Sequence, residues 1–423
     1  MSGTIYALSS GAPPAAIAIV RISGARADAA LEALTGRLPE PRRATLVAVR
    51  SGDGEVLDHA LALRFPGPNS ATGEDLAELH LHGGRAVVAS VLRALGASDG
   101  LREAEPGEFT RRAFENGRID LAEAEGLADL LAAETQAQRR AAQLIAGGAL
   151  SRNVEAWRAE TLELAAALEA ALDFGDEGDV GEELPAGWRE RLAAVRGDVE
   201  AALLRAPAER LREGVRVAIA GPPNVGKSSL LNALAGRDAA ITSEIAGTTR
   251  DVIEAPTAIG GVAFLLTDTA GLRESDDRVE AVGIERARQA VGAADLVLWL
   301  GAPEDAPEDA IIVHPKADLD PPDARSHIAV SAMTGAGLAA LAALLAGRAR
   351  LLLPAEGEVA LNARHRSALA EVVECLCAAG DTADLIIAAE ALRQARVTLD
   401  RVTGRAGVED MLDALFGRFC IGK

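Results

Sequence analysis

The sequence predicts a multidomain protein with an α+β N-terminal domain, an α-helical middle domain and an α/β nucleotide-binding domain inserted into the helical one. Short alternating apolar runs broken by Gly and Pro fill the first part of the chain. Leucine-lined helical patterns occur on both sides of the insertion. Between them, an apolar strand, a glycine-rich loop and a helix start follow one another. We expect domains at 1–118, at 119–211 with 355–423, and at 212–354.

Composition bounds the class of protein. A chain of 423 residues can hold two or three domains, and 49% hydrophobic and 25% charged residues are ordinary for a globular protein. No apolar run reaches the length of a membrane span, and the N-terminus has no pattern of a signal peptide. Three cysteines cannot form a disulfide framework. We therefore expect a cytoplasmic protein. The net charge of −20 argues against wholesale coating of nucleic acid. Any RNA contact would need a local patch or a partner.

The N-terminal part shows β-type alternation and one amphipathic helix. The expected strands are Ala16–Ile22, Thr45–Arg50, His59–Phe65 and Leu76–Leu81, followed by a helix at Arg85–Leu95. His80 and His82 share one face of their strand. They could hold a metal, but with no third ligand nearby a solvated or hydrogen-bonded pair is favoured.

The helical part presents stripes of period 3.6, each of which needs a partner helix. The stripes consist of Trp157, Leu164, Leu168 and Leu172, of Leu369, Val372, Val373 and Leu376, and of Leu385, Ala388, Leu392 and Leu399. An acidic loop at 173–179 lacks the closing glutamate of a calcium loop, so a solvated turn is favoured over a calcium site.

The central motif runs from Gly221 to Ser228 and fits G-x-x-x-x-G-K-[ST] between a strand and a helix. The glycines let backbone N–H groups turn toward phosphates, and the helix N-terminus adds partial positive charge. Lys227 should reach the β- and γ-phosphates, and the Ser228 hydroxyl should bind Mg²⁺. The alternative is a glycine-rich turn that happens to end in Lys-Ser.

Two loops further along fit a γ-phosphate switch. In residues 245–251, Thr249 is the candidate that closes over Mg²⁺ and the γ-phosphate. Asp268 follows an apolar strand and could hold Mg²⁺ through water, while Gly271 could donate its N–H to the γ-phosphate. The next residue is Leu272, which cannot orient an attacking water. Glu280 is the nearest carboxylate that could, although an exposed charge at a helix start explains it equally well.

Two later loops point to guanine rather than adenine. The Asp318 carboxylate can accept from the guanine N1–H and N2–H₂ groups, and the stem of Lys316 can lie over the base. A backbone N–H at Ser331-Ala332 could meet guanine O6. Pro315 stands where such a loop normally has Asn, and residues 301–308 are too short and proline-rich for a full crossover helix.

Several motifs, in order, resemble the MnmE or TrmE family of tRNA modification GTPases, within the TrmE-Era-EngA-YihA-Septin-like superfamily. The motifs lie at 4–5, 19–24, 65–70, 72–75, 106–114, 120–125, 246–251, 268–274 and 419–423. The resemblance implies a folate-binding N-terminal domain that dimerises, a helical domain and a potassium-dependent GTPase domain. It implies action, with a flavoprotein partner of the MnmG or GidA type, at C5 of the wobble uridine (U34) of certain tRNAs. An aminomethyl-type (carboxymethylaminomethyl) group would be installed there.

The resemblance also implies cofactors and site residues. Mg²⁺, K⁺ and a 5-formyl- or methylene-tetrahydrofolate are expected, with FAD on the partner only. The potassium ligands would be Asn224, Ser243, Ile245 and Thr248, and the magnesium ligands would be Ser228 and Thr249. The folate-binding residues would be Arg21, Glu78, Arg118 and Lys423, with Cys420 beside Lys423. Catalytic residues would be Glu280, Lys227 and Thr249. The candidate GTP-binding residues are Asn224, Val225, Gly226, Lys227, Ser228, Ser229, Ser243, Glu244, Ile245, Ala246, Gly247, Thr248, Thr249, Asp268, Thr269, Ala270, Gly271, Lys316, Asp318, Ser331 and Ala332.

Two other functions stay open at this point. One is a GTP-dependent binding switch, for example in ribosome assembly, but the chain shows no basic RNA-binding module. The other is a folate-dependent one-carbon transferase with a degenerate nucleotide domain, which Pro315 suggests and the intact Lys227 and Ser228 oppose. Arg111 and Arg112 are candidates for RNA contact, although an exposed ion-paired face is the favoured account.

Overall fold

A computed structural model describes residues 3–174, 184, 186–236, 254–269, 288–406, 409–417 and 419–423. These residues form two compact units, one of 1–128 with 403–423 and one of 129–402. The division groups 119–128 with the N-terminal sheet and joins the helical and nucleotide-binding parts in one unit. The three domain boundaries expected from the sequence therefore stay a prediction.

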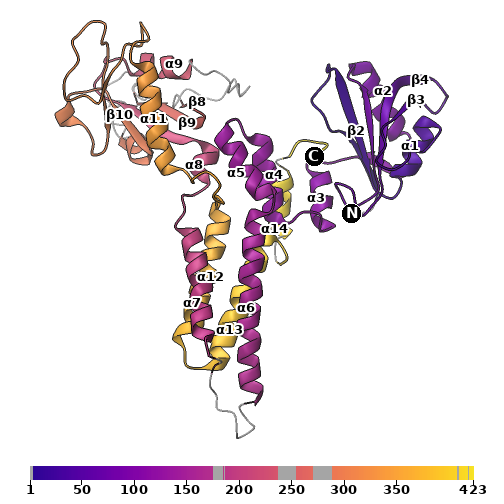
Figure 1. Cartoon of the computed structure of the whole chain (residues 1–423). Coiled ribbons are helices and arrows are strands. Elements are labelled where there is room, and N and C mark those ends of the chain that lie inside the picture. Colours follow the sequence, from indigo (N-terminus) through magenta and orange to yellow (C-terminus); the bar gives the residue numbers. More distant parts are fainter. Residues whose placement is uncertain are drawn as a thin grey trace, which may run out of the picture. The chain divides into compact units, whose positions relative to one another are not determined.

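The first unit is built on a six-stranded sheet (Figure 1). Its strands, in spatial order, are β3 (Thr45–Arg50), β4 (Val56–Phe65), β5 (Leu76–His82), β2 (Ile17–Ser23), β1 (Thr4–Leu8) and β6 (Leu101–Glu103). Only β1 and β6 pair in parallel; the other pairs are antiparallel. The expected strands are confirmed, with β4 beginning earlier than predicted.

One face of this sheet is covered by α1 (Ala27–Thr35) and α2 (Arg85–Gly96), because every second strand residue is apolar and packs against them. On the other face, Phe109 of α3 (Glu108–Glu115) packs with Ile5 of β1. The start of α4 (Leu121–Ala132) and α14 (Glu409–Phe416) form a small core of their own in this unit.

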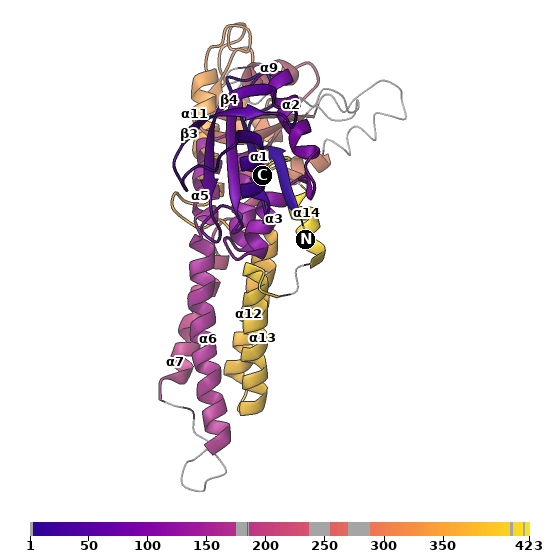
Figure 2. The ribbon, with the colours of Figure 1, turned by 90° about the vertical axis from the view of Figure 1, so that its right-hand side faces the viewer.

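The second unit contains a bundle of long helices drawn from distant parts of the chain (Figures 1 and 2). The bundle consists of α6 (Ala149–Phe174), α7 (Trp188–Leu203), α12 (Ala363–Asp381) and α13 (Leu385–Thr403). Arg158 of α6 pairs with Asp400 of α13 at 2.7 Å, which joins the segments on either side of the insertion. Most residues of the predicted stripes are buried, but Val373 and Leu385 are half-buried, and Leu172 is 37% exposed in the last turn of α6. Periodicity could not show where the neighbouring helices stop covering α6.

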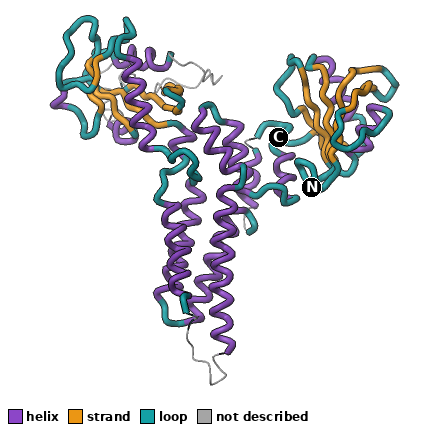
Figure 3. Tube along the Cα trace, in the orientation of Figure 1, coloured by secondary structure: helices purple, strands orange, loops and turns teal. Residues whose placement is uncertain are grey.

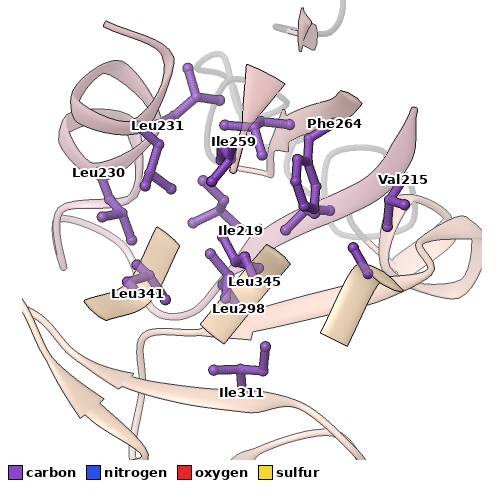
Figure 4. Close-up of a cluster of buried hydrophobic side chains, with 14 of the residues drawn as sticks. Val215, Ile219, Leu230, Leu231, Ile259, Phe264, Leu298, Ile311, Leu341 and Leu345 are labelled. Atoms are coloured by element: carbon purple, nitrogen blue, oxygen red, sulfur yellow. The ribbon is translucent and has the colours of Figure 1, made fainter. Parts of the chain in front are cut away.

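The inserted part holds the second sheet, whose strands stand out in Figure 3. Its spatial order is β12 (Ile328–Ala329), β11 (Ile311–His314), β10 (Leu296–Trp299), β7 (Val215–Ala220), β9 (Val262–Asp268) and β8 (Glu254–Ile259). Only β8 pairs antiparallel. Side chains of α9 (Lys227–Ala235) and α11 (Leu338–Leu352) join the strands in one apolar core, part of which Figure 4 shows.

Three shorter elements also lie in the described part of the second unit. They are α5 (Gln136–Ala146), α8 (Glu209–Glu213) and the 3₁₀ helix η1 (Pro303–Asp305). The parallel strands β10 and β11 are joined through η1 alone, which confirms that residues 301–308 form no full helix. Among the described residues, no helix combines the length and apolar character needed to cross a bilayer.

Candidate nucleotide-binding site

The glycine-rich loop joins the C-terminal end of β7 to the N-terminus of α9. Gly221 and Gly226 adopt φ angles of 145° and 110°, and Asn224 adopts 60°, a left-handed conformation that Asn tolerates better than most residues. A Cβ on Gly221 would lie 3.0 Å from the backbone carbon of Leu300, so the loop is held close to the end of β10. The tight turn aims the first N–H groups of α9 at the mouth of the loop, an arrangement that binds phosphate.

Two side chains at the start of α9 face this loop. The Lys227 ammonium donates to the carbonyl oxygens of Gly221 and Pro222 at 2.9 and 2.7 Å, so its charge lies inside the loop. The Ser228 hydroxyl donates to the Asp268 carboxylate at 2.5 Å. Asp268, the last residue of β9, is 1% exposed. A hydroxyl and a carboxylate that meet at a phosphate loop are the oxygen ligands that Mg²⁺ prefers.

Thr269 fixes the beginning of the second switch loop. Its hydroxyl donates to the Ile219 carbonyl in β7 at 2.9 Å and is buried. Because Ile219 also pairs with Asp268 in the parallel ladder, the two strands end in register. The sequence marked Thr269 only as part of a motif and carried no signal for this bond.

The loops expected to bind the base lie beside the glycine-rich loop. The Lys316 ammonium donates to the Asn224 carbonyl at 3.0 Å, and the Ala317 N–H donates to the Val330 carbonyl at 3.0 Å. Asp318 is exposed, whereas Ser331 is buried and its hydroxyl accepts from the Thr334 N–H. Lys316 therefore forms a strut to the phosphate loop in a chain where Pro315 offers no side-chain amide.

Many of the predicted site residues lie outside the described residues. They are Ser243, Glu244, Ile245, Ala246, Gly247, Thr248, Thr249, Ala270, Gly271 and Glu280, together with most of the acidic loop, 175–179. The structure thus brings together the P-loop, Asp268, Thr269 and the two base loops. It does not bear on the water-orienting or potassium-binding assignments beyond Asn224. Within the described ranges, no group of three or more His, Cys, Asp or Glu side chains is arranged to hold a metal ion.

A second candidate site lies on the sheet of the first unit. Arg21 and Glu78 face each other across β2 and β5, with Arg21 Nε 2.7 Å from Glu78 Oε1. Burial opposes the charge on Glu78, but the bonds from Arg21 and from His80 outweigh it and hold the pKa of this carboxyl below its ordinary value. His82 bonds to Asp58 instead, so the two histidines are hydrogen-bonded separately, as favoured from the sequence.

The C-terminal segment reaches the same sheet. A Cβ on Gly422, at φ 92°, would lie 2.2 Å from the Leu8 carbonyl at the end of β1, and Ile421 forms an antiparallel bridge with Pro106. Leu8 pairs with Val20, the residue before Arg21, so the C-terminal segment ends beside β1, the strand next to the one that carries Arg21. Arg118 is exposed, and the structure shows no contact that joins it to that pair.

The proposed exposed face at Arg111 and Arg112 is wrong for Arg112. Arg112 is buried and bonds to Glu74 and Glu108 at 2.9 Å each, while Glu108 also pairs with Arg102. The sequence could not reveal this, because helical spacing alone did not show that the α3 face carrying Arg112 is turned inward. Arg111 is ion-paired with Glu115 and Asp413.

The sheet is parallel except at β8, and a glycine-rich loop follows its inner strand β7. Together with the inward lysine and the serine bonded to a strand-end aspartate, it defines a P-loop nucleotide-binding protein. The loops at Lys316 and Ser331, which the sequence predicts to bind guanine, adjoin the glycine-rich loop, as expected for a GTPase. A family model of the MnmE helical domain matches residues 121–420, and one of the GTP-binding protein TrmE N-terminus matches residues 4–118.

Relatives match the chain over its length. The tRNA modification GTPase MnmE of Rhizorhabdus wittichii is 61% identical over 427 residues, covering 100% of this chain and 97% of that protein. MnmE of Erythrobacter litoralis is 56% identical over 423 residues, covering 99% and 100%. The chain therefore belongs to the MnmE (TrmE) family of tRNA modification GTPases, which confirms the resemblance and the fold class inferred from the sequence.

Solved structures match only in part. The G domain of the T. maritima FeoB iron transporter is 27% identical and covers 32% of this chain and 98% of that one, with a TM-score of 0.25. A score this low supports no conclusion.

Proposed function

We propose that this chain hydrolyses GTP and acts in the modification of the wobble uridine of certain tRNAs. The observation that carries the proposal is the joined geometry of Lys227, Ser228 and Asp268 in a chain of this family. In the nucleotide-bound state, the Lys227 ammonium would exchange the Gly221 and Pro222 carbonyls for phosphate oxygens. That exchange is favourable because anionic oxygens accept stronger hydrogen bonds than neutral ones.

Magnesium fits the residues present. Ser228 and Asp268 meet at 2.5 Å, and their hydroxyl and carboxylate oxygens would hold the cation. Bound there, Mg²⁺ would neutralise charge that develops on the β- and γ-phosphates. Thr249 completes the set in the proposal.

The proposed hydrolysis also depends on potassium. Asn224 is exposed at the loop mouth, and its backbone carbonyl is held by Lys316, so its side-chain amide oxygen can turn toward a monovalent cation. Ser243, Ile245 and Thr248 would supply the remaining oxygens. K⁺ would give a positive charge beside the phosphates where other GTPases use an arginine. Glu280 orients the attacking water, since Leu272 cannot.

The first unit supplies the one-carbon donor site. Arg21 and Glu78 offer a guanidinium and a carboxylate to the charged and pterin ends of a tetrahydrofolate, and Arg118 and Lys423 add positive charge. A homodimer, a flavoprotein partner of the MnmG type carrying FAD, and tRNA complete the cytoplasmic reaction. The product is an aminomethyl-type group at C5 of the uridine.

The experiment compares GTP hydrolysis in K⁺ and in Na⁺ at matched ionic strength, with Asn224→Ala and Glu280→Ala alongside. Activity in K⁺ only, lost in both variants, supports the mechanism. Equal slow rates in both salts, unchanged by either substitution, would refute it. A separate assay of tRNA modification with the flavoprotein partner distinguishes the modification enzyme from a GTP-dependent binding switch.

A further inference from the structure

The proposed substrate is a polyanion, yet the chain carries a net charge of −20, so its phosphate contacts need a local cationic surface. The arginines first considered for RNA do not serve. Arg112 is buried in an ion-pair network, and Arg111 is paired with two carboxylates. A different surface meets the requirement.

That surface is the solvent-facing stripe of α5. Residues 135–154 contain no Asp or Glu, although the whole chain has 63 of them. The helix buries Ala142 and Ile145, and Ala137 and Ala141 pack against the core of the nucleotide-binding sheet. The exposed side chains that remain on the helix are Gln136, Arg139, Arg140 and Gln143.

The arginines of this stripe differ in what they bind. Arg140 pairs with Glu356 at 2.5 Å. Arg139 donates to the side-chain oxygens of Gln143 and Gln136 at 3.0 and 3.2 Å, and these amides carry no charge. Arg152, just past the turn, donates to the Gly147 carbonyl that ends α5 at 2.8 Å. Among the described side chains, neither Arg139 nor Arg152 takes part in an ion pair.

Arg139 on α5 and Arg152 in the first turn of α6 lie toward different ends of α5. Arg139, Gln143 and Gly147 follow one another at four-residue spacing, so they lie on one line that covers roughly 12 Å at 1.5 Å per residue. Arg152 bonds at the far end of that line. Two guanidinium groups placed in this way could contact different phosphates of a nucleic-acid strand.

The stripe also indicates the kind of partner. Its exposed side chains are guanidinium and amide groups, and no apolar side chain interrupts them. A protein interface normally has an apolar centre, whereas a phosphate backbone needs N–H donors and positive charge. A guanidinium already oriented by two glutamines keeps N–H groups free for a bidentate phosphate contact.

We propose that Arg139 and Arg152, with Gln136 and Gln143, form a contact surface for the phosphate backbone of the tRNA substrate. The proposal rests on the proposed function, since it takes tRNA as the substrate. It assigns sequence-independent contacts, which position the RNA, and leaves base recognition to other residues.

The test measures binding of a tRNA transcript with an unmodified wobble uridine to the full chain over a series of KCl concentrations. The variant is Arg139→Gln with Arg152→Gln. The control is Arg189→Gln with Arg393→Gln, which removes the same charge from exposed arginines on α7 and α13. The first variant should lose roughly tenfold or more in affinity, with a salt slope smaller by about two, because each phosphate contact contributes about 0.9 to that slope in a duplex. The control should bind like the parent chain.

Three other outcomes of the binding experiment would contradict the proposal, each in a different way. Salt-dependent tRNA binding that is the same in the parent and the Arg139/Arg152 variant would overturn the proposal and leave the function intact. If the parent chain binds no tRNA, the proposed function itself fails. If the variant binds tRNA normally but loses the flavoprotein, the stripe is a protein surface and the assignment to RNA is wrong. Arg139→Lys with Arg152→Lys keeps both charges and should restore most of the salt slope, which separates lost charge from misfolding.

Discussion

The buried ion-pair network of α3 gives the sharpest test of how the first unit is held together. Arg112 is 3% exposed and Glu108 is 1% exposed, and Arg112 also donates to the Gly3 carbonyl and to Glu74. In Arg112→Met, Glu108 keeps only Arg102 as a charged partner, and the Gly3 carbonyl loses its donor. Removing one partner of a buried pair costs about 3–5 kcal/mol. We expect that loss in the stability of the first unit.

Hydrogen exchange of peptides from β1 and β2 measures this locally, which avoids assigning one free energy to a chain with several units. A cost of about 3 kcal/mol or more speeds exchange by roughly a hundredfold or more, at about 1.4 kcal/mol per decade. Arg111→Met is the matched control. Its side chain is 28% exposed and its partners Glu115 and Asp413 are more exposed still, so we expect less than about 1 kcal/mol. Equal exchange rates in the two variants would refute the reasoning.

The same network predicts a pH dependence. Burial opposes the charge on Glu108, but Arg102, the Glu105 N–H and Arg112 together hold its pKa below the ordinary value. A carboxyl whose pKa is lowered on folding adds stability above its unfolded pKa, and this stability is lost as pH falls through the folded pKa. The protection of β1 and β2 amides, taken relative to their intrinsic exchange rate at each pH, should therefore fall in acid, and the fall should be smaller in Arg112→Met. Parallel acid profiles for the variant and the parent chain would contradict this.

Three further predictions concern the loops. Gly221→Ala should weaken GTP binding measured by titration calorimetry, because its Cβ would lie 3.0 Å from the Leu300 backbone at φ 145°. Gly292→Ala, which has open space around it, is the control, and equal affinities of the two variants would count against the close approach. Pro315→Asn should raise GTP affinity by several-fold, since it restores a side-chain amide beside the Lys316 strut, and unchanged affinity would show that the strut alone suffices. Gly422→Ala should weaken 5-formyl-tetrahydrofolate binding, because its Cβ would collide with the Leu8 carbonyl at 2.2 Å. Gly11→Ala is the control. Binding retained in Gly422→Ala would show that the C-terminal segment is not part of the folate site.

Local pattern predicted much of the fold. Alternation marked strands of the first sheet, and a short apolar run followed by the P-loop motif placed the phosphate site between β7 and α9, since these signals lie within a few consecutive residues. The short proline-rich segment after Leu300 correctly excluded a full crossover helix. Each of these features depends on backbone preference and local spacing, which one sequence displays directly.

What the sequence by itself determined is therefore the class of each part, the order of the parts and the identity of the phosphate-binding loop. The tertiary structure decided which polar groups meet. It placed Ser228 against Asp268, Lys316 against the Asn224 carbonyl, and Arg112 inside rather than on the surface. Such pairs join residues tens of positions apart, and their geometry depends on how strands register and which face of a helix is covered. Burial then sets how much each pair matters for stability. An exposed ion pair contributes little, whereas removing one partner of a buried pair costs several kcal/mol.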